Sequence, residues 1–137
     1  MDDQLDERSR KAVAQLVDVC RSCKGVLLTA AEVAESIDLR RQFHRRAAQW
    51  ARLENALSKT EPNRTRRDLP LGDTAGTLQR AWIKIKSAMG DMDAIAAECD
   101  QRESHALRQL EAALDAGLPH SMRSLLLRFA RRESGVR

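Results

Sequence analysis

Tyrosine is absent from this 137-residue sequence, and aromatic residues make up only 3% of it. Because strands are enriched in aromatic and β-branched residues, this scarcity argues against a β-rich fold. Glycine and proline are also few, at six and three residues, so little interrupts the helix-favouring Ala, Leu, Arg and Glu. The sequence predicts an all-α protein with a single domain over residues 1–137.

Long hydrophobic runs and export signals are missing too. No stretch approaches the ~18 uninterrupted apolar residues of a membrane-spanning helix. Met1–Lys11 is polar and acidic, without the basic region and apolar stretch of a secretory signal peptide. Three cysteines without such a signal do not suggest a disulfide framework. We therefore expect a cytoplasmic protein that does not enter the membrane.

Motifs that carry enzyme chemistry are equally scarce. The glycines are scattered, so no phosphate-binding loop is present, and no serine has the neighbours of a known nucleophile motif. A four-helix di-metal site needs Glu-x-x-His pairs, and the sequence contains none. His44, His105 and His120 have no acidic residue three or four positions away. We predict no catalytic, cofactor-binding or metal-binding residues, and no enzyme activity.

Glu103 is the one acidic residue at an expected core position. A lone inward-facing glutamate usually pairs with an arginine, and Arg102 and Arg21 are the candidate partners. Glu98 lies on the same predicted helix as Glu103, and Glu54 lies on another predicted helix. One alternative is therefore a degenerate metal-binding or redox protein that uses Glu98, Glu103 and a cysteine. A weak metal site that includes Glu54 is also open.

The Cys20-Arg-Ser-Cys23 pair has the spacing of a redox dithiol. A reactive thiolate is usually placed at a helix N-terminus, whereas both residues fall in the middle of a predicted helix at core positions. Cys99 also falls at a core position, and Leu27 stands where helical thiol peroxidases have histidine. We expect all three cysteines to be small buried hydrophobic residues.

An apolar heptad pattern that no charge interrupts extends from Ala12 to Ile37. Such a wide apolar face is typical of a core helix in a bundle. Glu32 and Glu35 lie off this face, so the helix contributes no core carboxylate. The residues at the two repeating core positions are Val13, Cys20, Leu27 and Ala34, and Leu16, Cys23, Ala30 and Ile37.

Spacing and breakers predict four main helices in two antiparallel hairpins, joined by a long connection that holds a shorter helix. Thr60–Asp73 is a polar loop with two prolines. The shorter helix has Leu78, Trp82, Ile85 and Met89 at helical spacing, and Trp50 and Trp82 are expected core anchors. The predicted helices cover residues 6–35, 39–59, 74–89, 92–116 and 119–133.

The segment from Gly76 to Ala88, GTLQRAWIKIKSA, resembles the signature of an uncharacterised bacterial family of the ferritin-like superfamily. Members are four-helix-bundle proteins of unknown function. The resemblance implies a ferritin-like four-helix bundle with a short crossover helix between its second and third helices, and implies no activity. Gln79, Ala81 and Leu110 depart from the family pattern. Further matching segments are Cys20, Ala30–Glu32, Ile95–Cys99, Glu103 and Leu118–Pro119.

The formal net charge is +4, mostly from arginine. Interleaved acidic residues and the lack of alternating aromatic residues favour an ordinary solvated surface. Weak binding of a polyanion or nucleic acid remains an alternative, although nucleic acid is not the expected partner. The clustered arginines are Arg40, Arg41, Arg45, Arg46 and Arg52; Arg64, Arg66 and Arg67; and Arg123, Arg128, Arg131, Arg132 and Arg137.

Unequal helix lengths suggest self-association. The first helix is about 45 Å long at a rise of 1.5 Å per residue, and the last is about half as long. The short last helix should leave part of the apolar groove between the first two helices uncovered. We therefore expect a non-enzymatic interaction or structural protein that forms a homo-oligomer, most simply a homodimer, through helices one and two.

Overall fold

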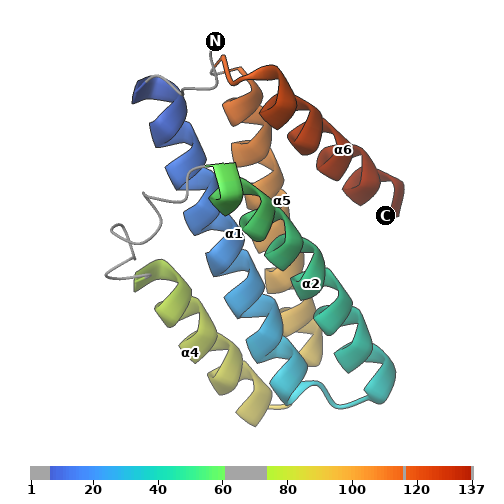
Figure 1. Cartoon of the computed structure of the whole chain (residues 1–137). Helices are drawn as coiled ribbons and strands as arrows, with labels where there is room; N and C mark the ends of the chain where they lie inside the picture. Colours follow the sequence, from blue (N-terminus) through green and yellow to red (C-terminus); the bar gives the residue numbers. More distant parts are fainter. Residues whose placement is uncertain (1–6, 61–73, 116, 137) are drawn as a thin grey trace.

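The structure, a computed structural model, describes residues 7–60, 74–115 and 117–136. These residues form helices and no strand, which confirms the all-α prediction for them. The predicted loop 60–73 and the arginines at positions 64, 66 and 67 lie almost wholly outside the described residues. The helices, shown in Figure 1, are α1 (Glu7–Val33), α2 (Ile37–Thr60), α4 (Thr74–Ala88), α5 (Met92–Leu114) and α6 (His120–Val136).

Helix α1 lies at the centre of the fold and forms an antiparallel hairpin with α2 (Figure 1). The heptad positions of α1 are almost completely buried, and Ser22, Thr29 and Ala31 on another side are buried as well. Because α1 contacts α2, α5 and α4, it is covered on more than one side. The hydroxyl Oγ of Ser36 accepts a hydrogen bond of 3.1 Å from the backbone N–H of Leu39, which caps the start of α2.

The heptad prediction is wrong at Ile37, whose exposed fraction is 62%. Helix α1 ends at Val33, and Ile37 is instead the first residue of α2. The apolar pattern therefore continues through the turn although the helix does not. The backbone N–H of Ala34 donates a hydrogen bond to the carbonyl of Ala31. This bond forms a tight final turn, so α1 ends before the apolar pattern does.

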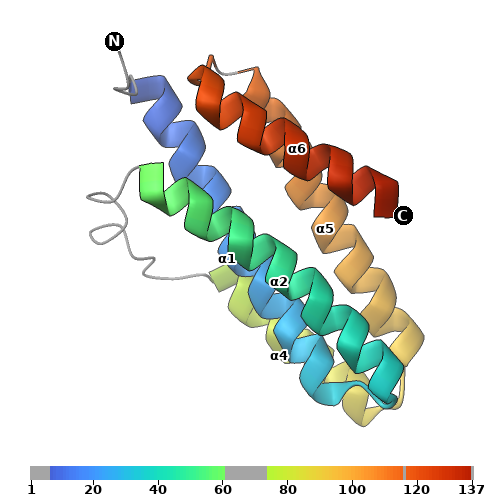
Figure 2. The ribbon, with the colours of Figure 1, turned by 45° about the vertical axis from the view of Figure 1, so that its right-hand side comes forward.

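Helix α4 packs along the C-terminal half of α1 and also contacts α5 (Figures 1 and 2). Ile83 is fully buried in this contact, whereas Trp82 is half-buried. Ile85 and Met89 share the expected helical spacing but are 59% and 68% exposed. Two residues correspond to about 200° around a helix, so burial of Ile83 directs Ile85 toward solvent.

Helix α6 folds back beside α5, and Figure 2 shows it lying next to α2 as well. Met122 and Leu126 are buried, and the ring of Phe129 contacts the ring of Trp50 on α2 with 4.8 Å between centroids. Trp50 is 1% exposed, which confirms that it is a core residue. Helices α2, α5 and α6 therefore meet around one indole ring.

An uncovered apolar groove between the first two helices is expected from the sequence. Large hydrophobic residues left exposed on α1 and on the described part of α2 are Leu28 (38%) and Ile37. Helix α4, the predicted shorter helix, covers one side of α1.

Candidate functional site

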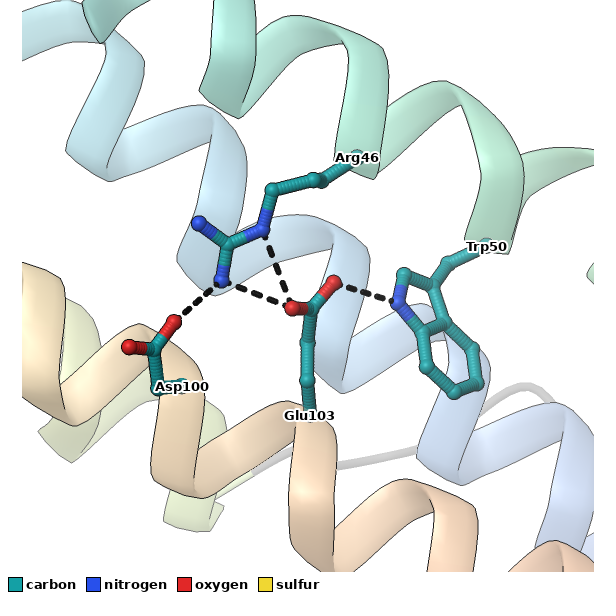
Figure 3. A network of polar contacts seen from close by, with 4 residues as sticks. All are labelled: Arg46, Trp50, Asp100 and Glu103. Carbon is teal, nitrogen blue, oxygen red and sulfur yellow. Dashed lines mark hydrogen bonds and ion pairs between the residues drawn. The ribbon is translucent and has the colours of Figure 1, made fainter. Parts of the chain in front are cut away.

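A network of buried polar contacts lies between α2 and α5, around the carboxylate of Glu103 (Figure 3). Glu103 is 5% exposed. Its Oε1 accepts hydrogen bonds from Nε and Nη2 of Arg46 at 3.0 and 2.7 Å. Its Oε2 accepts a hydrogen bond of 2.9 Å from Nε1 of Trp50. Both carboxylate oxygens are therefore engaged by donors of α2.

Arg46 connects this buried carboxylate to the surface. Its Nη2 also donates to Oδ1 of Asp100 at 2.9 Å, and the Asp100 side chain is 70% exposed. Burial alone lowers the pKa of Arg46, but its hydrogen bond to Glu103 and the charges of Glu103 and Asp100 raise it overall. The guanidinium therefore stays charged and neutralises Glu103. This network connects α2 to α5, and it engages both oxygens of the buried Glu103 carboxylate.

The prediction that Glu103 pairs with an arginine is confirmed, but the predicted partners are wrong. Arg46 of α2 replaces Arg102 and Arg21, because Glu103 faces α2 across the bundle. Arg21 instead binds a different glutamate. Its Nε donates to Oε2 of Glu54 at 3.0 Å, and Nζ of Lys24 donates to Oε1 of Glu54 at 2.8 Å.

The acidic residues of the metal hypothesis lie in separate places. Glu54 binds cations of α1, Glu103 binds a cation of α2, and Glu98 is half-buried on α5. Throughout the described ranges, no three His, Cys, Asp or Glu side chains gather closely enough to hold a metal ion.

The three cysteines are buried free thiols, as the heptad pattern predicts. Burial, assisted by the charge of Glu54, raises the pKa of Cys20 to about 12. Burial also raises the pKa of Cys99 to about 12 and that of Cys23 well above its ordinary value. The thiols therefore stay protonated at neutral pH, and protonated thiols are poor nucleophiles.

Three of the clustered arginines form hydrogen bonds with other parts of the bundle. Arg46 belongs to the Glu103 network, Arg40 donates to the backbone carbonyl of Ala34, and Arg123 donates to that of Leu114. The side chains of Arg132 and Arg137 lie outside the described part. The described arginines of these clusters that are exposed at the surface are Arg40, Arg41, Arg45, Arg52, Arg128 and Arg131.

A hollow of about 200 Å³ between α2 and α6 brings two of these arginines together. Sequence reasoning missed it, because no pattern within one helix indicates how α6 crosses α2. The sequence feature that could have indicated the hollow is an arginine directly before a leucine at a core position, Arg52 and Leu53. The lining residues are Gln49, Arg52, Leu53, Leu125, Arg128 and Phe129.

Comparison with known proteins identifies a family and no function. Within the described ranges, no helix is long and apolar enough to cross a membrane. No curated protein and no solved structure matched the chain. Residues 10–116 match a family described as a domain of unknown function (DUF2383), and the chain belongs to that family.

Proposed function

We propose that this protein is a non-enzymatic helical bundle that acts in the cytoplasm through contacts with proteins, including copies of itself. The observation that supports the proposal best is the state of its buried carboxylates. Glu103 is neutralised by Arg46, and Glu54 is neutralised by Arg21 and Lys24. Carboxylates held in this way are poorly suited to bind a metal or transfer a proton, because the neighbouring cations would repel both.

The proposal includes a ferritin-like arrangement of the helices without a complete di-metal site. Two hairpins, α1–α2 and α5–α6, with α4 between them in the chain, are compatible with that arrangement. The ferritin-like assignment itself comes from the resemblance of Gly76–Ala88 and of the matching segments before and after it, such as Ala30–Glu32 and Ile95–Cys99.

Self-association is the proposed mode of action for which exposed side chains give direct support. Ile37, Ile85 and Met89 are each more than half exposed. The α1–α2 and α4–α5 connections lie at the same end of the molecule in Figures 1 and 2. Burying a side chain of this size stabilises an interface by about 1.5–3 kcal/mol. We therefore place the homodimer contact at this end, where α2 begins and α4 finishes.

Sedimentation velocity at concentrations from nanomolar to high micromolar tests the homodimer. We expect a dimer that dissociates on dilution, and a monomer for the double variant Ile85→Glu, Met89→Glu. Lys84→Glu is the matched control, because Lys84 is exposed on the same helix and its variant should remain dimeric. A wild-type monomer at every concentration would contradict the proposal.

The alternative of a degenerate metal or redox protein makes a separate prediction. Untagged protein purified without chelators would then contain near-stoichiometric iron, manganese or zinc, and Glu103→Gln would lower that content. Elemental analysis that finds almost none of these metals supports the non-enzymatic proposal instead.

A further inference from the structure

The hollow between α2 and α6 combines an apolar floor with cations at its edge. Leu53 is 2% exposed, and Leu125 and Phe129 are half-buried beside it. The Phe129 ring lies against Trp50 at an interplanar angle of 59°, so the floor continues into the core. A closed apolar cavity of about 150 Å³ holds one benzene ring. The hollow, at about 200 Å³, therefore has room for one apolar side chain.

The two cations at the edge come from different helices. Arg52 belongs to α2 and Arg128 to α6, and both are exposed. Neither forms an ion pair with another residue in the part of the chain that the structure describes. This distinguishes them from Arg46, whose charge is neutralised inside the protein. Two guanidinium groups beside an apolar floor favour an anion that carries an apolar group.

The positive charge extends beyond the hollow along α2. Positions 41, 45, 48, 52, 55 and 59 recur every three or four residues, so they share one side of the helix. They carry arginine, arginine, alanine, arginine, asparagine and lysine, and all six residues are exposed. This basic stripe contains no carboxylate and spans about 27 Å at 1.5 Å per residue. From His120 to Arg131, α6 also carries no acidic residue.

We propose that the hollow and the basic stripe form a docking surface for an acidic segment of a partner protein. One leucine or phenylalanine side chain of that segment would enter the hollow, and carboxylates on either side of it would pair with Arg52 and Arg128. Further carboxylates would meet Arg41, Arg45 and Lys59. The proposal rests on the protein-contact function proposed above and adds the chemistry of the partner.

The length of the stripe and the shape of the hollow decide between possible occupants. A small carboxylate would occupy only the hollow, whereas the charge continues far along α2. A nucleic acid would meet the stripe but would make little use of the hollow, because the Phe129 ring is packed against Trp50 and is not free for base stacking. An acidic segment with one apolar anchor uses both features, as interface hot spots commonly do.

Fluorescence anisotropy with the full-length protein tests the proposal. The probe is a fluorescein-labelled glutamate-rich peptide with one central phenylalanine, and its comparison peptide has serine at that position. We expect the phenylalanine peptide to bind about tenfold more tightly. Arg52→Gln and Arg128→Gln should each weaken its binding about fivefold. Arg108→Gln is the matched control, because Arg108 is exposed on α5 and does not line the hollow.

Filling the hollow provides a test that leaves the charges unchanged. Gln49→Trp should abolish the preference for phenylalanine over serine, while far-ultraviolet circular dichroism and urea unfolding confirm that the variant is folded. Equal binding of the two peptides by the wild-type protein would overturn the proposal. So would an absence of binding at low salt, or tighter binding of a thymidine oligonucleotide that Gln49→Trp does not affect.

The outcome is distinguishable from that of the homodimer test. A monomer that prefers the phenylalanine peptide removes self-association and keeps the docking surface. A dimer that shows no preference removes the docking surface and keeps self-association. The two sets of variants lie on different elements, α4 with its following turn and the α2–α6 surface, so each can be measured in the other's assay.

Discussion

The indole Nε1 of Trp50 donates a hydrogen bond of 2.9 Å to Oε2 of Glu103, across 53 positions of the sequence (Figure 3). The same indole ring contacts Phe129. Trp50 therefore joins three helices through one polar and one apolar contact. The hydrogen bond gives the buried indole N–H an acceptor, which a purely apolar core would not supply.

Removal of the carboxylate should destabilise the fold more than any surface change. In Glu103→Ala, the indole N–H and the partly buried guanidinium of Arg46 both lose their acceptor. Breaking a buried ion pair costs about 3–5 kcal/mol, and the partial exposure of Arg46 places the expected loss at about 3 kcal/mol. Urea unfolding followed by tryptophan fluorescence measures this free energy.

Two further variants check the cause of that loss. Glu103→Gln keeps an acceptor for Trp50 but loses the charge, so its free energy of unfolding should lie between those of the wild type and Glu103→Ala. Asp100→Asn removes only the exposed partner of Arg46 and should change stability by at most about 0.5 kcal/mol. An equal effect of the Asp100 and Glu103 variants would show that burial of the pair is unimportant.

The three thiols should react with a thiol reagent only after the protein unfolds. Cys20, Cys23 and Cys99 are at most 1% exposed, and burial raises their pKa values. A reagent therefore cannot reach the sulfur atoms, and the reactive thiolate form is scarce. We expect almost no reaction with Ellman's reagent at mildly alkaline pH in buffer, and three reacting thiols in concentrated urea. Fast reaction of even one thiol in buffer would contradict the buried arrangement.

Stability should fall as the pH rises above 9. The ordinary pKa of a thiol is 9.0, which applies to the unfolded chain, whereas Cys20 and Cys99 in the folded protein titrate at about 12. Between these values the unfolded state loses protons that the folded state keeps, so alkali favours unfolding. The expected loss is about 1.4 kcal/mol per pH unit for each thiol.

Urea unfolding under reducing conditions, at about pH 8 and about pH 10, measures this loss. The double variant Cys20→Ala, Cys99→Ala lowers stability at both pH values because it leaves cavities. Only the difference between the two pH values reports the thiols, and it should be smaller in the variant. An unchanged difference would assign the alkaline effect to other groups, such as the lysines.

The sequence predicted burial best where the pattern of residues along a single helix is clear. Cys20, Cys23 and Cys99 are buried as the periodicity predicts, because the residues three and four positions before each of them are also apolar. The periodicity of α4 was ambiguous, since Ile83 and Ile85 are both apolar and only packing against α1 selects Ile83. A helix was nevertheless predicted in each of the segments where the structure has one.

Sequence patterns did not predict which residues of different helices contact one another. Glu103 pairs with Arg46 instead of Arg102 or Arg21, because the pairing depends on how α2 is rotated against α5. The hollow that contains Arg52 and Arg128 depends in the same way on the path of α6 across α2. Spacing along one helix contains no information on either angle.

The turn between α4 and α5 contains two residues, Gly90 and Asp91, whose substitution should lower the free energy of unfolding. Gly90 has a φ of +76°, a conformation that costs about 1–2 kcal/mol for a residue with a Cβ atom. Asp91 follows as the N-cap of α5 and accepts a hydrogen bond of 3.1 Å from the N–H of Ala94. Gly90→Ala and Asp91→Ala should therefore each lower the free energy of unfolding by about 1 kcal/mol.

Asp93→Ala is the matched control for the cap. Asp93 is an exposed acidic residue in the first turn of α5, so only its weaker interaction with the helix dipole is lost, about 0.3–0.5 kcal/mol. No atom lies within 4 Å of a Cβ built on Gly90, so any loss in Gly90→Ala reports backbone strain and not a clash. Gly117, with a φ of +77° and the same open surroundings, should respond equally to alanine. If both glycine variants unfold at the wild-type urea concentration, the left-handed backbone at these helix ends is not present in solution.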